Sequence, residues 1–395
     1  MTAALPVLDP YDYAFHDDPY PLYALLRERA PLYRNDELGF WALSRHADVL
    51  TAFRESERFS SAEGVSLDPA ATGSHAWRVM SFLAMDDPRH FRMRSLVTKG
   101  FTPRRVAALE VRVREITREH LSEALSSDSF DFIDDLAGKV PMDVVSELLG
   151  VPVADRAELR RLADLVVHRD DGVLDVPPAA ADASLQLIVY YLELVNDRRA
   201  QRRDDLTSAL LDVDIDGEHL TDDELCAFLF LMVVAGNETT TKLLGNAWYW
   251  ANENPLQKAK AFDGALMPWV DETLRFDASS QLLARTVAQD TSLHGQTLRQ
   301  GERLLLLIGS ANRDVLVFPE PDVYDLDRDT TELLSFGTGT HFCLGASLAR
   351  LEARVVLEEL AGLVKAYDID NAASERVHSV NVRGFAHLPT TVVLR

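Results

Sequence analysis

The stretch LLSFGTGTHFCLGASLARLEARVV, from Leu333 to Val356, places one of the chain's two cysteines between a glycine-rich turn and an amphipathic segment. Downstream of Cys343, leucine and valine recur at helical spacing, so we predict that a helix begins just after the thiol. Backbone N–H groups and the positive end of such a helix favour the thiolate form of a preceding cysteine. Upstream, Gly337 and Gly339 permit a tight turn whose backbone can lie close to a flat partner.

This pattern leaves three interpretations of Cys343 open. A lone cysteine is commonly a small buried hydrophobic residue. A nucleophilic cysteine needs a histidine and a carboxamide or carboxylate nearby, and His341 is the only local candidate. A single cysteine without a CxxC or HExxH pattern cannot complete a zinc site, whereas one thiolate is sufficient for haem iron because the porphyrin supplies four ligands. Cys226 lacks comparable neighbours, so we expect it in the core.

The composition excludes several classes of protein. The chain has 395 residues, 47% of them hydrophobic, which is enough to bury a large core. A formal net charge of −23 argues against a nucleic-acid-binding surface, which needs basic residues to neutralise phosphates. Two cysteines cannot form a disulfide framework, and neither a signal peptide nor an apolar segment of about 20 residues is present. We therefore predict a cytoplasmic protein that contacts no membrane.

The rest of the sequence predicts a mainly α-helical chain with a minor β-sheet, folded as a single domain over residues 1–395. A long helix is expected from Thr221 to Asn254, because a TDDE capping box precedes its apolar run and Pro255 follows it. Residues Ala62–Ala84 show no period and predict a long functional loop. Glycine and paired prolines interrupt the segment Arg169–Ala183, which we interpret as a mobile lid.

Within the predicted long helix, the stretch AGNETTT from Ala235 to Thr241 is unusual for a helix interior. Glycine costs about 1 kcal/mol relative to alanine there, and asparagine and threonine are also poor helix formers. The apolar run FLFLMVV immediately before it indicates a buried location. Gly236, Glu238 and Thr239 are explained if this helix leaves room for a small ligand and delivers protons to it.

Taken together, these motifs resemble those of the cytochrome P450 family. The stretch FGTGTHFCLG resembles the family's haem-binding signature, and AGNETTT resembles its oxygen-activation motif. ETLR, from Glu272 to Arg275, resembles the family's buried charge pair, which we assign to structure. The resemblance extends over nearly the whole chain and implies the triangular, mostly helical cytochrome P450 fold around a buried haem b.

The resemblance also implies roles for individual residues. It makes Cys343 the axial ligand of the haem iron. It assigns Thr239 to positioning dioxygen and its waters, and Glu238 to a proton relay. The two haem propionates need cationic or hydrogen-bonding partners. The expected cofactor-binding residues are Cys343, His90, Arg94, Arg285, His341, Phe336 and Gly337.

By the same resemblance, substrate specificity is expected from largely apolar residues in several segments. The lid for this pocket is expected from Val166 to Leu187. The expected pocket residues are Trp77, Phe82, Leu83, Met232, Val233, Ala235, Leu282, Leu283 and Phe385.

The implied activity is that of a haem-thiolate monooxygenase of the bacterial type, acting in secondary metabolism. It would insert one atom of O2 into a hydrophobic small molecule by hydroxylation or epoxidation. Electrons would come from NAD(P)H through a ferredoxin reductase and a ferredoxin, and a monomer is expected. Two alternatives remain: a peroxide-driven haem peroxygenase and a non-catalytic haem-binding sensor. Neither would have much use for Glu238 and Thr239.

The expected electron donor raises a question of charge, because two-iron ferredoxins are typically acidic and this chain is acidic too. Exposed charges more than about 10 Å apart are largely screened at 0.1 M salt, so a local basic patch matters more than net charge. We predict docking at basic residues that cluster in two consecutive helical segments. These residues are Arg89, Arg92, Lys99, Arg104, Arg105, Arg112 and Arg114.

Overall fold

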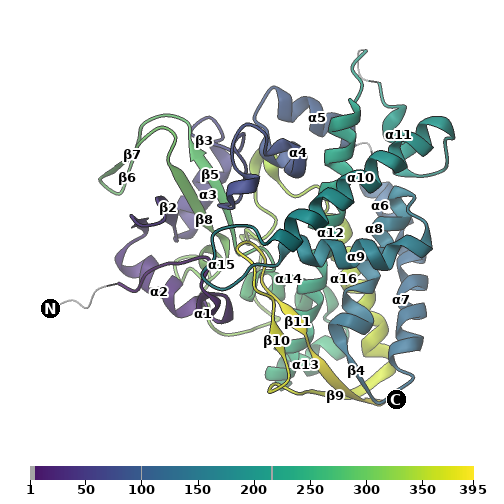
Figure 1. Cartoon of the computed structure of the whole chain (residues 1–395). Coiled ribbons are helices and arrows are strands. Elements are labelled where there is room, and N and C mark those ends of the chain that lie inside the picture. The colour runs from purple at the N-terminus through teal and green to yellow at the C-terminus, as the bar shows by residue number, and fades with distance from the viewer. Residues whose placement is uncertain (1–4, 99, 215–216) are drawn as a thin grey trace.

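The computed structural model describes residues 5–98, 100–214 and 217–395, and its architecture is mainly helical with minor sheets (Figure 1). A mixed sheet and the first helices lie on one side, coloured purple and green, and a larger helical body lies on the other. The long helix α12 (Asp222–Glu253) runs through this body. Among the described residues, no helix combines the length and apolarity needed to cross a membrane.

The helices before α12 come mostly from short amphipathic segments. They are α1 (Tyr13–Asp17), α2 (Tyr20–Arg29), α3 (His46–Arg54), η1 (Pro69–Ala71), α4 (Trp77–Met80), η2 (Ser81–Ala84), α5 (Arg89–Thr98), α6 (Pro103–Ala108), α7 (Glu110–Ala124), the π-helical η3 (Ile133–Ala137), α8 (Lys139–Leu149), α9 (Val153–Val167), α10 (Pro178–Ala200) and α11 (Leu206–Leu211). Those after it are α13 (Pro255–Phe262), α14 (Leu266–Phe276), α15 (Ile308–Ala311), η4 (Gly339–His341) and α16 (Ala346–Leu363).

The strands form one five-stranded sheet of order β1-β2-β8-β5-β3, one three-stranded sheet of order β4-β12-β9, and two small hairpins. In the larger sheet, β2 and β8 are parallel and the other pairs are antiparallel. The strands are β1 (Leu32–Asn35), β2 (Phe40–Leu43), β3 (Phe59–Ser60), β4 (Ser129–Asp131), β5 (Leu282–Val287), β6 (Thr291–Leu293), β7 (Gln296–Leu298), β8 (Arg303–Leu307), β9 (Val364–Ile369), β10 (Glu375–Arg376), β11 (Phe385–His387) and β12 (Pro389–Leu394).

The boundaries of α12 confirm the helix predicted from the capping box. The Thr221 side chain accepts a hydrogen bond from the Glu224 backbone N–H at 3.2 Å, and the Glu224 carboxylate accepts one from the Thr221 N–H at 3.1 Å. The helix ends at Glu253, with Asn254 as its C-cap. Because α8, α9, α10, α14 and α16 all pack against it, most of its residues are buried. An interior helix of this kind can present its motif to a cavity.

The predicted lid is shorter than the sequence suggested. Helix α10 begins at Pro178, so the part of the expected irregular segment from Pro178 to Ala183 is helical, and residues 168–177 alone join α9 to α10 without helical structure. Proline is favoured in the first turn of a helix because its missing N–H has no partner there in any case, so the paired prolines start α10. The predicted loop Ala62–Ala84 likewise contains the short helices η1, α4 and η2.

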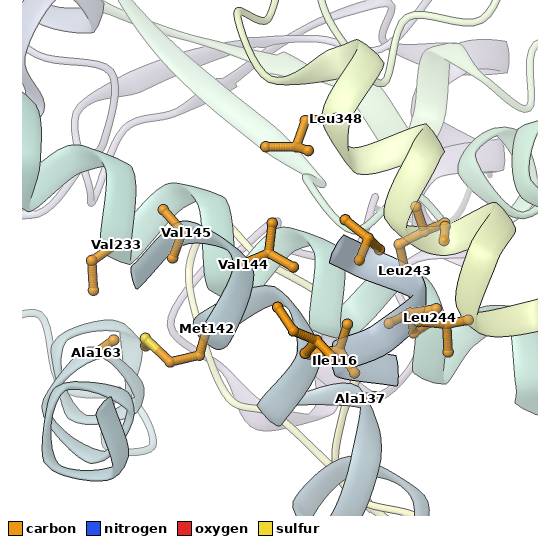
Figure 2. Close-up of a cluster of buried hydrophobic side chains, with 14 of the residues drawn as sticks. Ile116, Ala137, Met142, Val144, Val145, Ala163, Val233, Leu243, Leu244 and Leu348 are labelled. Carbon is orange, nitrogen blue, oxygen red and sulfur yellow. The ribbon is translucent and has the colours of Figure 1, made fainter. Parts of the chain in front are cut away.

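The core of the helical body is continuous from Phe82 to Val392. Figure 2 shows part of it, where the side chain of Val233 on α12 points toward Met142 on α8 and Ala163 on α9. Leu243 on α12 and Val145 on α8 form part of a cavity wall. Helix α12 therefore contributes both to the core and to the wall of the space that contains the functional site.

Candidate functional site

The Cys343 loop follows a tight turn and ends at the start of α16, as the sequence predicted. Gly337 and Gly339 have φ angles of +64° and +71°, a region that favours glycine. A Cβ on Gly339 would lie 3.1 Å from the Phe53 carbonyl oxygen, so the close approach of α3 also requires glycine. The Cys343 N–H donates to the Phe336 carbonyl at 2.9 Å and closes the loop.

The thiol of Cys343 is held by the first turn of α16. The backbone N–H groups of Gly345 and Ala346 donate to its sulfur. The side chain is accessible because it lines an internal cavity, and the surrounding protein still desolvates it. Desolvation outweighs the two N–H donors and the Arg94 and Arg350 charges, so the pKa of the thiol is raised above its usual value. The N–H groups at the helix start favour the thiolate, as the sequence predicted, but they do not outweigh desolvation.

The cavity is a slot between α12 and the Cys343 loop, with about 1400 Å³ of atom-free space including its opening. One wall consists of α12 residues at helical spacing, among them Ala235, Gly236 and Thr239. The opposite wall consists of the Cys343 loop and the first turns of α16. A Cβ on Gly236 would meet no atom closer than 3.9 Å, so this glycine keeps space open rather than permitting close packing.

Four basic side chains from α5, β5 and the Cys343 loop gather at one edge of the slot. His90 and His341 have ring centroids 4.1 Å apart. Arg94 and Arg285 also reach the slot, and Arg285 donates to the Ala284 carbonyl at 2.9 Å. Desolvation, followed by the charges of Arg285, His90 and Arg94, lowers the pKa of His341 to about 2. Desolvation also lowers the pKa of Arg285 to about 10. The edge is therefore a basic cluster suited to anionic groups.

Polar atoms in this cluster lack protein partners. His90 Nε2 and Arg94 Nη1 are buried without a hydrogen bond to any described residue. The other guanidinium end of Arg94 donates to the Phe342 carbonyl at 2.6 Å, and His90 Nδ1 lies 3.4 Å from the Asp87 carboxylate. An unpaired buried donor is costly, so these atoms point to a ligand with acceptor oxygens.

Glu238, which precedes Thr239 in the motif, points away from the slot. It is 1% exposed, and its Oε2 lies 3.4 Å from the ammonium nitrogen of Lys242 one turn later. Asp164, at the surface on α9, hydrogen-bonds the same carboxylate. Desolvation and Glu238 raise the pKa of Asp164 to about 8. Although burial opposes it, the Lys242 charge and the hydrogen bond from Asp164 hold the pKa of Glu238 below its usual value.

The charge pair of ETLR lies beside the site and is fully enclosed. Arg275 binds the Glu272 carboxylate with both Nε and Nη2 at 2.7 Å, and both side chains are buried. Arg275 also donates to the carbonyls of Asn312 and Pro321 at 3.1 and 2.9 Å. These bonds join α14 to the segment that leads to the Cys343 loop, which agrees with the structural role we assigned to the pair.

Comparison with known proteins decides the family. A family profile described as Cytochrome P450 matches residues 266–369. The putative cytochrome P450 123 of Mycobacterium tuberculosis is 59% identical over 392 residues, which cover 98% of each chain. This chain belongs to the cytochrome P450 family. It is therefore a haem-thiolate monooxygenase in general type, and its cofactor is haem b.

Two further cytochromes P450 extend the comparison. The methyl-branched lipid omega-hydroxylase of Mycobacterium tuberculosis is 34% identical and covers 93% of this chain and 90% of its own. A solved cytochrome P450 from Bacillus megaterium, in complex with testosterone, superposes with a TM-score of 0.88 at 30% identity, covering 95% of this chain and 97% of its own. The fold is thus that of the bacterial cytochromes P450.

The residues around the slot fit a haem. A flat group is accommodated between Gly236 on α12 and the glycine turn of the Cys343 loop, and its two carboxylates match the unpaired donors of His90 and Arg94. The thiol of Cys343 faces the same space. Every cofactor-binding residue predicted from sequence lies at this slot, with His90 at its outer edge in an adjoining surface pocket.

Part of the predicted P450 substrate pocket lines the cavity and part does not. Phe82, Leu83, Met232, Ala235 and Leu283 line it.

The other four expected pocket residues lie elsewhere. Val233 is on the core side of α12 (Figure 2). Leu282 precedes Leu283 in β5, and because strand residues alternate faces, it packs into a separate core cluster. Phe385 packs against Tyr249, with ring centroids 4.7 Å apart. Trp77 lies under the Arg89 guanidinium, 4.3 Å from it. These four assignments are corrected.

Sequence reasoning missed several residues that line the cavity of this cytochrome P450. Leu243 follows Thr239 by one helical turn, so the spacing of the motif itself could have indicated it. Val65 lies in the predicted loop, and Pro141 and Val145 come from α8, for which no local pattern gave a signal. Glu352 on α16 also reaches the cavity, and burial raises its pKa well above the usual value.

Three of the basic residues predicted to receive a ferredoxin are already paired. Arg112 binds Glu147 at 2.8 Å, Arg114 binds Glu359 and Glu358, and Arg92 binds Glu224 at 2.9 Å. Lys99 lies outside the described residues.

Arg104 and Arg105 are exposed and form no salt bridge with the described part of the chain. Arg89 is likewise exposed and forms no salt bridge in the described part of the chain, so these three arginines are the cations of the predicted patch that remain available to a partner.

Proposed function

We propose that this cytochrome P450 inserts one oxygen atom of O2 into an apolar small molecule, and that the thiolate of Cys343 would hold its haem b. The observation that carries this proposal is the slot itself. It has a thiol on one wall, a threonine hydroxyl on the other, a basic cluster at one edge and an apolar end. No single segment of the chain contains these features together.

Different residues of the chain would hold the sulfur ligand and the propionates of the haem. When bound, haem supplies the activation of dioxygen. The N–H groups of Gly345 and Ala346 orient the sulfur of Cys343 and withdraw charge from it. His90, Arg94, Arg285 and His341 would hold the propionates.

Thr239 is one of two α12 threonines, with Thr240, that line the cavity. Its hydroxyl donates to the Ala235 carbonyl at 2.7 Å, so it can accept a further hydrogen bond from water in the slot. We assign Thr239 to proton delivery in the slot. Glu238 supplies protons from the opposite face of α12, and its carboxylate must turn away from Lys242 to reach the cavity.

The apolar lining at one end of the cavity favours a hydrophobic substrate. Phe82, Leu83, Val65, Met232 and Leu283 line it and exclude water from the reacting end. The related lipid omega-hydroxylase and the testosterone complex support a lipid or steroid among the hydrophobic classes. A screen of fatty acids, steroids, terpenoids and polyketides by the haem absorption shift tests this. Binding confined to polar compounds would contradict it.

We propose that electrons arrive from NAD(P)H through a ferredoxin reductase and a ferredoxin that docks near Arg104 and Arg105 on α6. The position of Thr239 in the cavity favours O2 over the peroxide-driven alternative, which needs no proton relay. Turnover with purified redox partners and NADH, compared with turnover on hydrogen peroxide alone, separates these two functions. A haem-binding sensor would turn over with neither.

We also propose that the chain acts as one domain, because residues from Phe82 to Val392 share one apolar cluster. A monomer, a cytoplasmic location and a part in secondary metabolism stay predictions. Size-exclusion chromatography with light scattering tests the first of these.

A further inference from the structure

The buried carboxylate of Glu238 has few hydrogen-bond donors around it. Its Oε1 accepts a long hydrogen bond of 3.5 Å from Asn237 Nδ2, and its Oε2 lies 3.4 Å from the Lys242 ammonium nitrogen. Apart from that ion pair, no amide, hydroxyl or guanidinium group of the described chain donates to Oε2. A buried acceptor left without a donor is costly, so this oxygen indicates a partner whose proton is not a permanent one.

That partner is the carboxyl group of Asp164, which hydrogen-bonds Glu238 from helix α9. Two carboxyl groups form such a bond only when one of them carries a proton. Helices α9 and α12 pack against each other, and Figure 2 shows Val233 on α12 pointing toward Ala163, the residue before Asp164. Asp164 is exposed, whereas Glu238 is 1% exposed, so the pair connects solvent with the helix interior.

The charges around the pair determine where its proton lies. Lys242 on α12 faces Glu238, and Arg160 lies one turn before Asp164 on α9, where it binds Asp134 at 3.0 Å. Lys242 favours the ionised form of Glu238, while desolvation and the Glu238 charge raise the pKa of Asp164 to about 8. Near neutral pH, Asp164 therefore holds the proton and Glu238 is ready to accept it.

We propose that Asp164 is the point at which protons enter from solvent, and that it reloads Glu238 from outside the slot. This inference rests on the proposed function of Glu238 and Thr239 in proton delivery. When Glu238 turns from Lys242 toward the slot, its carboxylate loses the stabilising charge and takes the proton of Asp164. The Asp164 O–H bond breaks, a Glu238 O–H bond forms, and Asp164 regains a proton from surface water.

Infrared spectroscopy of the holoenzyme tests the shared proton without turnover. A protonated carboxyl group has a C=O stretch that its carboxylate lacks. The parent should lose one such band as the pH rises, with a midpoint near pH 8. The band should be absent from Asp164→Asn. It should persist in Glu158→Gln, the matched control, which removes an exposed carboxylate bound to Arg161 on the same helix.

Turnover with NADH and purified redox partners tests the entry of protons. Asn keeps the size of Asp and can still donate an N–H to Glu238, but it has no proton to transfer. Asp164→Asn should therefore slow product formation at least about tenfold, within the range of general acid catalysis. The parent rate should fall as the pH rises through about 8, and the variant should lack this fall. Asp164→Glu should recover rate and profile.

The haem absorption spectrum and ligand affinity should be those of the parent in every variant, because Asp164 does not line the cavity. Turnover of Asp164→Asn equal to that of Glu158→Gln would overturn the proposal, as would an unchanged carboxyl band. A failure of the proposed function is separable from this: it would leave Thr239→Ala fully coupled. If Thr239→Ala loses coupling while Asp164→Asn keeps its rate, only the entry point is wrong.

Discussion

At the scale of single residues, the site depends on side chains whose neighbours set their chemistry. Cys343 is a soft ligand because sulfur is polarisable, and two N–H groups lower the pKa of its thiol. Burial nevertheless raises that pKa overall, so a bound cation is what would stabilise the thiolate. Cys226, the other cysteine, is buried with its sulfur 3.6 Å from the Ile188 carbonyl. The two thiols are chemically alike and differ only in surroundings.

Replacing Cys343 by alanine should abolish the long-wavelength absorption band of the reduced carbon monoxide complex, the band that gives the family its name. The band depends on thiolate ligation, and alanine offers no ligand. Cys226→Ala is the matched control and should keep the band. An unchanged spectrum in Cys343→Ala would remove the ligand assignment.

Replacing Thr239 by alanine should leave haem and ligand binding close to the parent and divert electrons from product to hydrogen peroxide, lowering the product formed per NADH severalfold. Without the hydroxyl, protons lose their ordered path in the slot. The measurement is product and peroxide per NADH consumed. Thr241→Ala is a suitable control, because it removes a buried hydrogen bond to Ala137 worth about 0.5–1.5 kcal/mol but lies outside the cavity. Full coupling in Thr239→Ala would contradict the relay.

At the scale of elements, α9 and α12 are linked by charge as well as by packing. Asp164 on α9 shares a hydrogen bond with Glu238 on α12, next to Lys242, while Arg160 on α9 binds Asp134 at 3.0 Å. A hydrogen bond between two carboxyl groups requires one of them to be protonated. The raised pKa of Asp164 identifies it as the protonated partner near neutral pH.

This pairing predicts a pH dependence of stability. The pKa of Asp164 rises from 3.8 to about 8 on folding, so the folded state binds the extra proton between about pH 4 and 8. The favourable contribution is full below pH 4 and is lost as the pH rises through 8. The melting temperature of the parent should therefore fall more than that of Asp164→Asn between pH 6 and 9. Parallel melting curves for the two proteins would show that the pair does not share a proton.

At the scale of the whole molecule, the net charge of −23 opposes the approach of an acidic partner. Long-range repulsion between acidic partners is screened in salt, so a small basic region decides docking. Arg112 is excluded from that region because Glu115, Glu119 and Glu147 surround it.

Reversing the charge at Arg104 should therefore slow reduction by an acidic ferredoxin, and the effect should be larger at low salt than at high salt. The substitution replaces an electrostatic attraction by a repulsion, and added salt weakens both, so the difference between parent and variant shrinks. Stopped-flow reduction across ionic strength measures it. Arg161→Glu on α9 is the control for a change of net charge elsewhere. Equal rates for Arg104→Glu and the parent at all salt concentrations would remove α6 as the docking site.

The sequence by itself determined the local features of this protein. The TDDE box specified the start of α12 to the residue, because a capping box is a contact between neighbours in the chain. The glycines at 337 and 339 specified the turn before Cys343 for the same reason. The family motifs then indicated the cofactor, because the residues that contact haem occur in short, recognisable stretches.

Only the tertiary structure decided which side chains share a space. Val233 and Leu282 satisfy the hydrophobic pattern as well as Met232 and Leu283 do, but they lie on the opposite faces of their helix and strand. The Asp164–Glu238 pair and the Arg169–Asp68 ion pair join residues 74 and 101 positions apart, and no local rule couples such residues. Local hydrogen bonds encode elements within a few residues, whereas cavity walls and buried ion pairs depend on how those elements pack.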